Sequence, residues 1–325
     1  MYNILVTGVG AIIGYGIINN LKKSKFNVNI IGMDIYPDAY GRHLCNQFIP
    51  AILASDEKYL DFIKDIIDTY HIDLVMFGTE QEIIRLVEAR KEMGEYYSKL
   101  VINKEEIVKL SQDKWLTYNF LLKNNFLPIP TKTNGNFKEN AIELGLPFLL
   151  KPRRSYASKG IKKIYTEEEF EFYKKKNPDQ FMVQKIIGDN NHEYTTAVFG
   201  FGDGDYAGPI TFKRKLSAEG ATAKAEVVNV NEINQLIRQY CSILKPIGPT
   251  NFQFRKDNDT FYLLEINPRI SSSTSLREGF GYNEAEMCIE FFINKIRPLN
   301  KAIKKGYAVR YIADCITYND DRNNI

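Results

Sequence analysis

An acid and an amide stand two residues apart at the end of an apolar run, in FYLLEINPRI at residues 261–270. In a β-strand, Glu265 and Asn267 point to the same face because the side-chain period is two. The preceding stretch TNFQF is expected to form the partner strand of a hairpin with a KDND turn, which brings Gln253 close to the level of Glu265. Carboxylate and amide oxygens suit Mg²⁺, a hard ion that also takes water and phosphate oxygens. The three side chains predict a magnesium site, and Arg269 beside it would stabilise negative charge on a phosphoryl group.

Basic residues gather in two other places. Lys151 ends the apolar run PFLLK and begins the loop KPRRSYASKG at residues 151–160, whose backbone N–H groups and positive charges could fold over a polyphosphate. A second basic set, KRK, occupies residues 213–215. Basic loops are more often solvated surface, but together with the carboxylate strand they indicate a nucleoside triphosphate.

The elements that position these groups begin with an alternation of strand and helix patterns over the first hundred residues. This succession predicts a parallel sheet with right-handed crossovers. Ligands of such sheets bind beyond the carboxyl ends of the strands, so Gly8, Asp34, Thr79 and Glu80 are expected on one rim.

The stretch GVGAIIG after the first strand permits a second interpretation, a dinucleotide site with Asp34 as the ribose-binding acid. The spacing departs from the fingerprint, because Ile13 stands where the third glycine belongs and Gly14 follows one residue late. The glycines can instead serve only a tight turn and close packing of the first helix. A nicotinamide-dependent oxidoreductase or sugar-nucleotide epimerase stays open on this motif, although no Tyr-x-x-x-Lys pair follows a fourth strand.

The remainder of the chain predicts a different architecture. Two short helices joined at residues 111–113 are followed by strands, a helix at residues 231–245, the hairpin and a helix near residues 284–295. The fold class is therefore mixed, α/β and then α+β. The change of pattern near residue 103 indicates a Rossmann-like domain at residues 1–102, and the family resemblance described below implies a small lobe with linker helices at 103–188 and a large lobe at 189–325.

Composition excludes several classes of protein. The 325 residues are 44% hydrophobic and 26% charged with a net charge of +3, as in an ordinary globular protein, and no basic stripe indicates nucleic acid. The four cysteines form no Cys-x-x-Cys pair, and three histidines leave few zinc ligands or proton shuttles. No run of about 18 apolar residues or basic leader occurs, so we expect no membrane segment and a cytoplasmic location.

The order of Lys114, the KPRRSYASKG loop, VQKIIG, HEY, FQF and LLEINPRISSS resembles an ATP-grasp enzyme. The last segment is most similar to the synthetase domains of the carbamoyl-phosphate synthetase large chain. The resemblance covers essentially the whole chain and implies a Rossmann-like pre-ATP-grasp domain, which in this superfamily binds no dinucleotide, followed by a two-lobed ATP-grasp fold.

The resemblance also implies roles for individual residues. Lys114 and Lys151 match the basic residues that hold the nucleotide, Gln184, Lys185 and Ile187 the adenine segment, and Glu193 the acid that binds the ribose hydroxyls; the loop adds Arg153, Ser158 and Gly160 as ATP-binding residues. Gln253, Glu265 and Asn267 match the ligands of one or two Mg²⁺ ions, which Mn²⁺ could replace. Arg269 matches the arginine beside the transferred phosphate, and Lys213 or Lys215 is expected to reach the γ-phosphate, with Arg214 left open.

Two departures stand out against the family pattern. The phosphate-covering loop has a single glycine, Gly160, among bulky and basic residues, so closure would depend on Arg153 and Arg154. Gln253 replaces the acid common at the first metal position, which weakens that metal site by one charge.

The chemistry implied is activation of a carboxylate. The γ-phosphoryl group of ATP would pass to a carboxylate to give an acyl phosphate, which an amine then attacks, so no protein nucleophile is needed. Thr79, Glu80, Ser271 and Arg277 are the expected substrate-binding residues, with helix capping by the serines and a surface position for Arg277 as the alternative. A non-catalytic ATP-binding module remains a further alternative. The partners expected are a small carboxylate and an amine, and the sequence leaves open which they are and whether the chain forms a homodimer.

Overall fold

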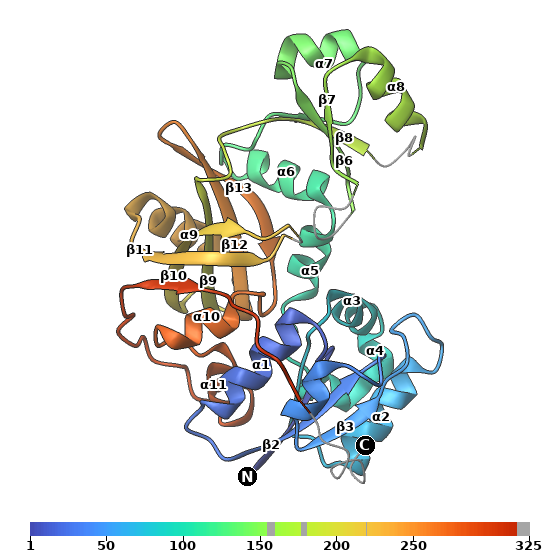
Figure 1. Cartoon of the computed structure of the whole chain (residues 1–325), viewed down its shortest axis with the longest axis vertical. Coiled ribbons are helices and arrows are strands. Elements are labelled where there is room, and N and C mark those ends of the chain that lie inside the picture. The colour runs from blue at the N-terminus through green and yellow to red at the C-terminus, as the bar shows by residue number, and fades with distance from the viewer. Residues whose placement is uncertain (155–159, 177–180, 219, 317–325) are drawn as a thin grey trace. The chain divides into compact units, whose positions relative to one another are not determined.

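The computed structural model describes residues 1–154, 160–176, 181–218 and 220–316. The chain divides into two compact units, the first made of Met1–Val101, Ser272–Pro298 and the described residues from Ala308, and the second of Ile102–Ser271 and Leu299–Tyr307. Figure 1 shows the elements of each unit.

The first unit contains a four-stranded parallel sheet in the order β3-β2-β1-β4, as the alternating pattern predicted. Its elements are β1 (Tyr2–Thr7), α1 (Ile12–Lys22), β2 (Val28–Asp34), η1 (Tyr40–Leu44), β3 (Gln47–Pro50), α2 (Tyr59–Thr69), β4 (Leu74–Met76), α3 (Glu80–Glu88), α4 (Arg90–Met93), η2 (Gly94–Lys99), α10 (Thr274–Gly279), α11 (Glu284–Cys288) and η3 (Ile289–Ile293). The helix α2 buries Tyr59, Ile63, Ile66 and Ile67, whose spacing of three and four residues places them on one face.

Residues 272–298 belong to the first unit. The sequence had placed them in the large lobe predicted at 189–325. Helix α10 packs on α1, where the Asn20 side-chain amide donates to the Thr274 hydroxyl at 2.8 Å. A Cβ atom on Gly16 would lie 2.6 Å from the Thr274 methyl group, so only glycine admits this approach. The packing that assigns α10 to the first unit depends on small residues in α1 that lie far away in sequence.

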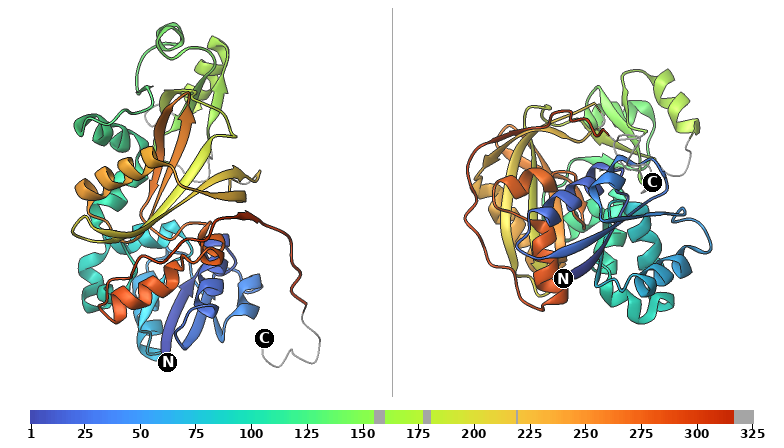
Figure 2. Two further views of the ribbon diagram at one scale, coloured as in Figure 1. Left: turned by 90° about the vertical axis from the view of Figure 1, so that its left-hand side faces the viewer. Right: turned by 60° about the horizontal axis from the view of Figure 1, so that its bottom comes forward.

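The second unit contains two sheets, a six-stranded one in the order β13-β12-β9-β10-β11-β14, of whose last strand only Tyr307 belongs to this unit, and a four-stranded one in the order β5-β8-β6-β7. Its elements are α5 (Glu105–Gln112), α6 (Lys114–Lys123), β5 (Thr131–Lys132), α7 (Phe137–Leu144), β6 (Phe148–Pro152), β7 (Lys162–Ile164), α8 (Glu167–Lys176), β8 (Phe181–Lys185), β9 (Glu193–Phe201), β10 (Tyr206–Leu216), β11 (Thr222–Val228), α9 (Asn231–Leu244), β12 (Ile247–Asp257), β13 (Thr260–Asn267) and β14 (Tyr307–Val309). After β14 the described chain continues without helix or strand to residue 316, shown in red in Figure 2.

The two short helices, the hairpin and the helix at 231–245 lie where the sequence pattern put them, as α5, α6, β12, β13 and α9. Helices α7 and α8 and strand β11 were not predicted. A capping box starts α7, in which Asn136 accepts from the Glu139 backbone N–H and the Glu139 side chain accepts from Asn136. Short helices of this kind depend on caps and on packing, here around Phe148 and Phe170, more than on a long apolar period.

One face of the six-stranded sheet carries the core of the unit. Tyr194, Phe252, Phe254, Leu263 and Ile266 pack there with residues of α9 and α5. The residues that alternate with them must point to the other face. This alternation is what positions the candidate site.

Within the described residues, no helix has both the length and the apolar character needed to cross a membrane.

Candidate functional site

The hairpin places the three predicted metal ligands on one face of the sheet. Gln253 lies directly opposite Glu265, and Asn251 lies opposite Asn267, so the expectation that Gln253 falls at the level of Glu265 is confirmed. Asn267 Oδ1 accepts from the Arg269 guanidinium at 3.0 Å, which also donates to the Ile270 carbonyl. The side chain of Glu265 makes no hydrogen bond or ion pair with the residues that the structure describes. Its carboxylate is therefore available to a ligand.

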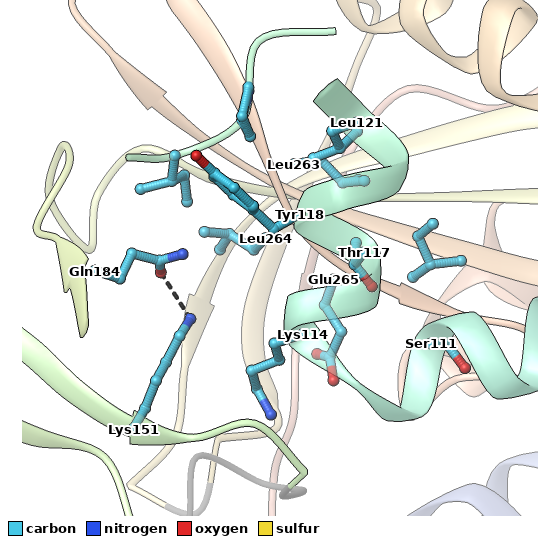
Figure 3. Close-up of a pocket in the computed structure, with 13 residues that line it drawn as sticks. Ser111, Lys114, Thr117, Tyr118, Leu121, Lys151, Gln184, Leu263, Leu264 and Glu265 are labelled. Atoms are coloured by element: carbon cyan, nitrogen blue, oxygen red, sulfur yellow. Dashed lines mark hydrogen bonds between the residues drawn. The ribbon is translucent and has the colours of Figure 1, made fainter. Parts of the chain in front are cut away.

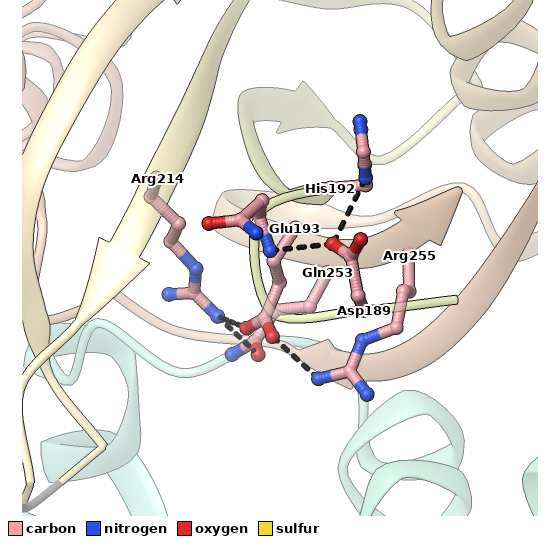
Figure 4. Close-up of polar contacts among 7 residues, drawn as sticks. Asp189, His192, Glu193, Arg214, Gln253 and Arg255 are labelled. Atoms are coloured by element: carbon pink, nitrogen blue, oxygen red, sulfur yellow. Dashed lines mark hydrogen bonds and ion pairs between the residues drawn. The ribbon is translucent and has the colours of Figure 1, made fainter. Parts of the chain in front are cut away.

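Glu193, expected at the ribose, lies at the centre of a buried ion cluster on the same face (Figure 4). It is 3% exposed, and its two carboxylate oxygens accept from Arg214 and Arg255, each at 2.8 Å. The same Arg214 nitrogen donates to Gln253 Oε1 at 2.6 Å. Both carboxylate oxygens are thus already hydrogen-bonded by arginines, so a ribose hydroxyl would have to share them.

The register of β10 decides which residue of the KRK set faces this cluster. Arg214 is paired with Glu193, and Lys213 with Tyr194, whose ring belongs to the core face. Since neighbouring residues alternate between faces, the side chains of Lys213 and Lys215 leave on the side opposite to Arg214. The structure therefore brings Arg214, and neither lysine, to the predicted metal ligands.

A cleft in the second unit collects three of the predicted nucleotide residues and one predicted metal ligand from four elements (Figure 3). Lys114 from α6, Lys151 from β6, Gln184 from β8 and Glu265 from β13 line it. Aromatic and aliphatic side chains form the rest of the wall, among them Tyr118, Leu263 and Leu264. A cleft with an apolar wall and convergent cations suits a ligand with a flat base and phosphates.

Lys151 is the most perturbed group of this cleft. Its side chain is 8% exposed, and Nζ donates to Gln184 Oε1 at 2.7 Å. The pKa of Lys151 is lowered to about 7, mainly by burial and also by the Lys114 ammonium group, while Glu265 opposes the shift. A lysine that is half-charged near neutral pH and held by one neutral amide is poised to gain a proton when an anion binds.

Gln184 is fixed at both ends of its amide, since its nitrogen donates to Thr131 Oγ1 at 2.8 Å. The structure thus gives Gln184 a positioning contact with Lys151. Of the neighbouring predicted residues, Ile187 is buried, while Lys185 is exposed and its backbone N–H donates to the Pro130 carbonyl at 2.9 Å. Neither belongs to the lining of the cleft.

The basic loop is anchored through Arg153, which binds both carboxylate oxygens of Asp113 at 3.1 and 2.6 Å. Burial raises the pKa of Asp113, but the hydrogen bonds from Arg153 and from the Trp115 backbone N–H outweigh it and lower the pKa overall. Gly160 has φ +79°, and a Cβ there would lie 2.8 Å from Pro152 Cγ, so glycine is required at this end of the loop. Ser158 lies outside the described residues.

A second pocket, of about 360 Å³, lies in the first unit at the carboxyl ends of its strands. Gly8, Asp34 and Thr79 line it, which confirms the predicted rim, whereas Glu80 does not line it. Glu82, which the sequence reasoning missed, does: hydroxyl groups of Thr79, Tyr59 and Thr7 donate to its carboxyl group, and burial raises its pKa. None of the lining residues is basic.

The other predicted substrate residues lie elsewhere. Arg277 is 0% exposed and pairs with the equally buried Glu284 at 3.3 Å, so the surface position that the sequence left open is wrong, and this burial disfavours direct substrate contact. Ser271 is buried at the end of its segment of the second unit. Ser273 is the N-cap residue of α10, but its side chain makes no capping hydrogen bond.

The glycines of the turn at residues 8–14 allow α1 to pack closely against β1. A Cβ on Gly14 would lie 2.3 Å from the Gly8 carbonyl oxygen, so α1 can approach β1 only with glycine there. Asp34 Oδ2 accepts from the Gly10 N–H at 2.8 Å, and Oδ1 accepts from the Tyr36 N–H at 3.0 Å. Both oxygens of Asp34 are used within the turn, which weakens the dinucleotide alternative.

Sequence reasoning missed several site residues besides Glu82, and some had a local signal. Arg255 follows Gln253 by two residues, so strand alternation alone would have put it on the site face. Asp113 precedes Lys114 as the N-cap of α6 and accepts from the Trp115 N–H, a typical capping signal. Thr131 had no such signal, because its role depends on the pairing of β5 with β8.

Comparison with known proteins adds a family match over part of the chain. Residues 179–315 match the model described as ATP-grasp in the biosynthetic pathway with Ter operon. The chain is also 23% identical over 217 residues to the C-terminal section of the carbamoyl phosphate synthase large chain of Aquifex aeolicus, an alignment that covers 61% of this chain and 40% of the relative. The chain spans between 18% and 40% of the lengths of the curated relatives it matches.

Solved structures share the fold across nearly the whole chain. The N5-carboxyaminoimidazole synthetase of Staphylococcus aureus complexed with ADP has a TM-score of 0.73 and 19% identity, covering 94% of this chain and 80% of that one. The L-amino acid ligase of Bacillus licheniformis has a TM-score of 0.65 and 14% identity, covering 90% and 74%. The family match places an ATP-grasp domain at residues 179–315, the solved structures show the same fold over nearly the whole chain, and in sequence the chain resembles the carbamoyl-phosphate synthetase large chain.

Proposed function

We propose that this protein is an ATP- and Mg²⁺-dependent ligase that phosphorylates a carboxylate and joins the acyl group to an amine, releasing ADP and phosphate. The observation that carries the proposal is the cleft of the second unit, where Lys114, Lys151 and the unbonded carboxylate of Glu265 meet from separate elements. A site with cations for phosphates and a carboxylate for a metal ion is what phosphoryl transfer needs.

Lys151 and Lys114 would bind the phosphates of ATP. The hydrogen bond from Lys151 to Gln184 holds the end of the lysine side chain in place before the nucleotide binds. Nucleotide binding therefore costs little side-chain entropy at this position. Because burial holds the pKa of Lys151 at about 7, the free site contains a large neutral fraction, and a phosphate would draw in the missing proton. The apolar wall around Tyr118 and Leu263 would receive the adenine.

Glu265 and Asn267 are the residues that would hold Mg²⁺, with Gln253 as the third predicted ligand. Among the described residues no group of three or more His, Cys, Asp or Glu side chains could hold a metal ion, so an ion here needs amide oxygens and substrate oxygens as well. The ion would neutralise charge on the transferring phosphoryl group. Arg269, which is hydrogen-bonded to Asn267, would lie beside the same group and stabilise its equatorial oxygens.

The pocket of the first unit offers a place for the other substrates. Its walls are largely apolar, and its polar groups include Asp34, Glu82 and Thr79. With carboxyl groups and no basic residue in its lining, it favours a neutral group or an amine over a carboxylate. This agrees with an amine as the attacking substrate, and the Bacillus licheniformis neighbour is itself named an amino acid ligase.

The proposal is tested by measuring ADP formation from Mg-ATP with pools of small carboxylates and amines. The wild type should form ADP only with the correct pool, and Glu265→Gln should lower the rate by about 10³-fold or more, because a metal ligand loses its charge. Glu226→Gln is the matched control, since Glu226 is paired with Lys213 and therefore lies on the opposite face of the same sheet. It should leave the rate unchanged.

The alternatives give different results in the same experiment. A non-catalytic ATP-binding module would bind Mg-ATP by calorimetry and form no ADP with any pool. A nicotinamide-dependent enzyme would bind NAD and not ATP, and either result would overturn the ligase.

A further inference from the structure

The Arg214–Gln253 contact determines what the first metal position can hold. Arg214 donates to Gln253 Oε1 at 2.6 Å, and both side chains belong to the face of the sheet that carries Glu265. A guanidinium group can only donate hydrogen bonds, so the amide of Gln253 must turn its carbonyl oxygen toward Arg214. That oxygen is the only atom of the side chain that could ligate Mg²⁺.

Glu193, the acid beside Gln253, cannot replace the Gln253 oxygen as a metal ligand. Glu193 is held between Arg214 and Arg255, with each of its two oxygens 2.8 Å from a guanidinium nitrogen. Glu193 and Arg214 are both almost fully buried, so breaking the pair would leave a charge without compensation in the interior. The cluster therefore offers a metal ion neither a carboxylate nor an unshared amide oxygen at this position.

The second metal position, formed by Glu265 and Asn267, has oxygen atoms available for an ion. The side chain of Glu265 makes no hydrogen bond or ion pair to another described residue. Asn267 shares its oxygen with Arg269 at 3.0 Å, but these two residues belong to one short segment, whereas Arg214 is also held by Glu193. Arg269 is also partly exposed, whereas Arg214 is buried.

We propose that the guanidinium of Arg214 takes the place of one of the two divalent ions, so that this site binds a single ion through Glu265 and Asn267. The inference rests on the proposed ATP-dependent function. Arg214 would supply a fixed positive charge facing the phosphates, since arginine stays protonated and its planar group matches phosphate oxygens. A second divalent ion beside this guanidinium would be repelled by its positive charge.

The experiment counts ions. Mn²⁺ is titrated, by electron paramagnetic resonance of free Mn²⁺, into the full chain saturated with a non-hydrolysable ATP analogue. We expect one bound Mn²⁺ per bound nucleotide in the wild type and two in the double variant Arg214→Ala/Gln253→Glu, in which an acid replaces the amide and the guanidinium is gone. Two ions in the wild type, or one in the double variant, would overturn the inference.

Two further variants keep the test decisive if the double variant does not fold. Gln253→Glu alone retains Arg214, so the new acid should pair with the guanidinium, and the count should stay at one; a count of two would overturn the inference. Lys224→Ala, on a residue paired with Lys215 and so away from the site face, should match the wild type. Calorimetry of the analogue distinguishes the two proposals, because a wild type that binds no nucleotide would refute the proposed function itself.

Discussion

The two faces of the six-stranded sheet are built from the same strands and have opposite characters. On one face Tyr194, Phe252 and Phe254 pack into the core with α9. On the other, Glu193, Arg214 and Gln253 form a buried polar cluster beside Glu265. Burial of apolar surface stabilises the fold, whereas buried charges contribute little net stability even when paired. The comparison indicates that one face holds the unit together and the other is maintained for a ligand.

Phe252→Ala should give the largest change in stability. Phe252 is 0% exposed and its ring stacks on that of Tyr240 at 5.7 Å between centroids. Removing it leaves a cavity, and we expect the free energy of unfolding to fall by about 3–5 kcal/mol, measured by urea denaturation. Nucleotide affinity, measured at a temperature where the variant remains folded, should be close to that of the wild type. A variant of normal stability that no longer binds nucleotide would break the distinction between the faces.

Lys151→Met should raise the stability of the protein and weaken ATP binding. Lys151 carries a burial penalty, so replacing it by an apolar side chain of similar length should raise the free energy of unfolding by an amount on the order of 2 kcal/mol. The same change removes a phosphate contact and should weaken ATP binding by about 100-fold. Thermal unfolding with and without Mg-ATP reports both effects.

The lowered pKa of Lys151 predicts how the stability and the ATP affinity of the protein change with pH. The pKa of Lys151 is about 7 in the folded protein, against 10.5 as its ordinary value, so between these pH values the unfolded chain binds more protons than the folded one. The stability advantage of Lys151→Met should therefore be largest below pH 7 and vanish as the pH rises toward 10.5. In the wild type, ATP affinity should fall about tenfold from pH 6 to pH 8, a loss that Lys151→Arg should abolish because arginine stays charged. Equal pH profiles for the wild type and Lys151→Arg would contradict this account.

The smallest effect is expected for a polar pair on the core face. Thr196 and Thr211 share a buried hydrogen bond of 2.9 Å between their hydroxyl groups. Replacing both by valine removes the donor and the acceptor together, so stability should change by less than about 1 kcal/mol and ADP formation should be unchanged. Urea denaturation and the ligase assay check this. A large loss of activity would show that the core face also takes part in the reaction.

Much of the fold could be predicted because the signals were local. The parallel sheet follows from short apolar runs alternating with helical periods, and α5 and α6 from two helical stretches that end before Pro128. Helix α8 was not predicted because it buries only Phe170 and most of its residues are charged, so its sequence has no apolar helical period. Helices α10 and α11 belong to the first unit through contacts with α1 that lie more than 250 residues away in sequence. No local pattern carries that information.

For the candidate site, the sequence by itself determined which residues share a face within one strand. Glu265 and Asn267 point the same way, and Gln253 joins them across a short turn, because the period of a strand and the length of a hairpin are local properties. Only the tertiary structure decided that Arg214, and neither Lys213 nor Lys215, faces Gln253, and that Glu193 is bound by two arginines. The reason is that register between distant strands depends on the pairing of β9 with β10 and β12, where a one-residue shift would turn every side chain to the other face.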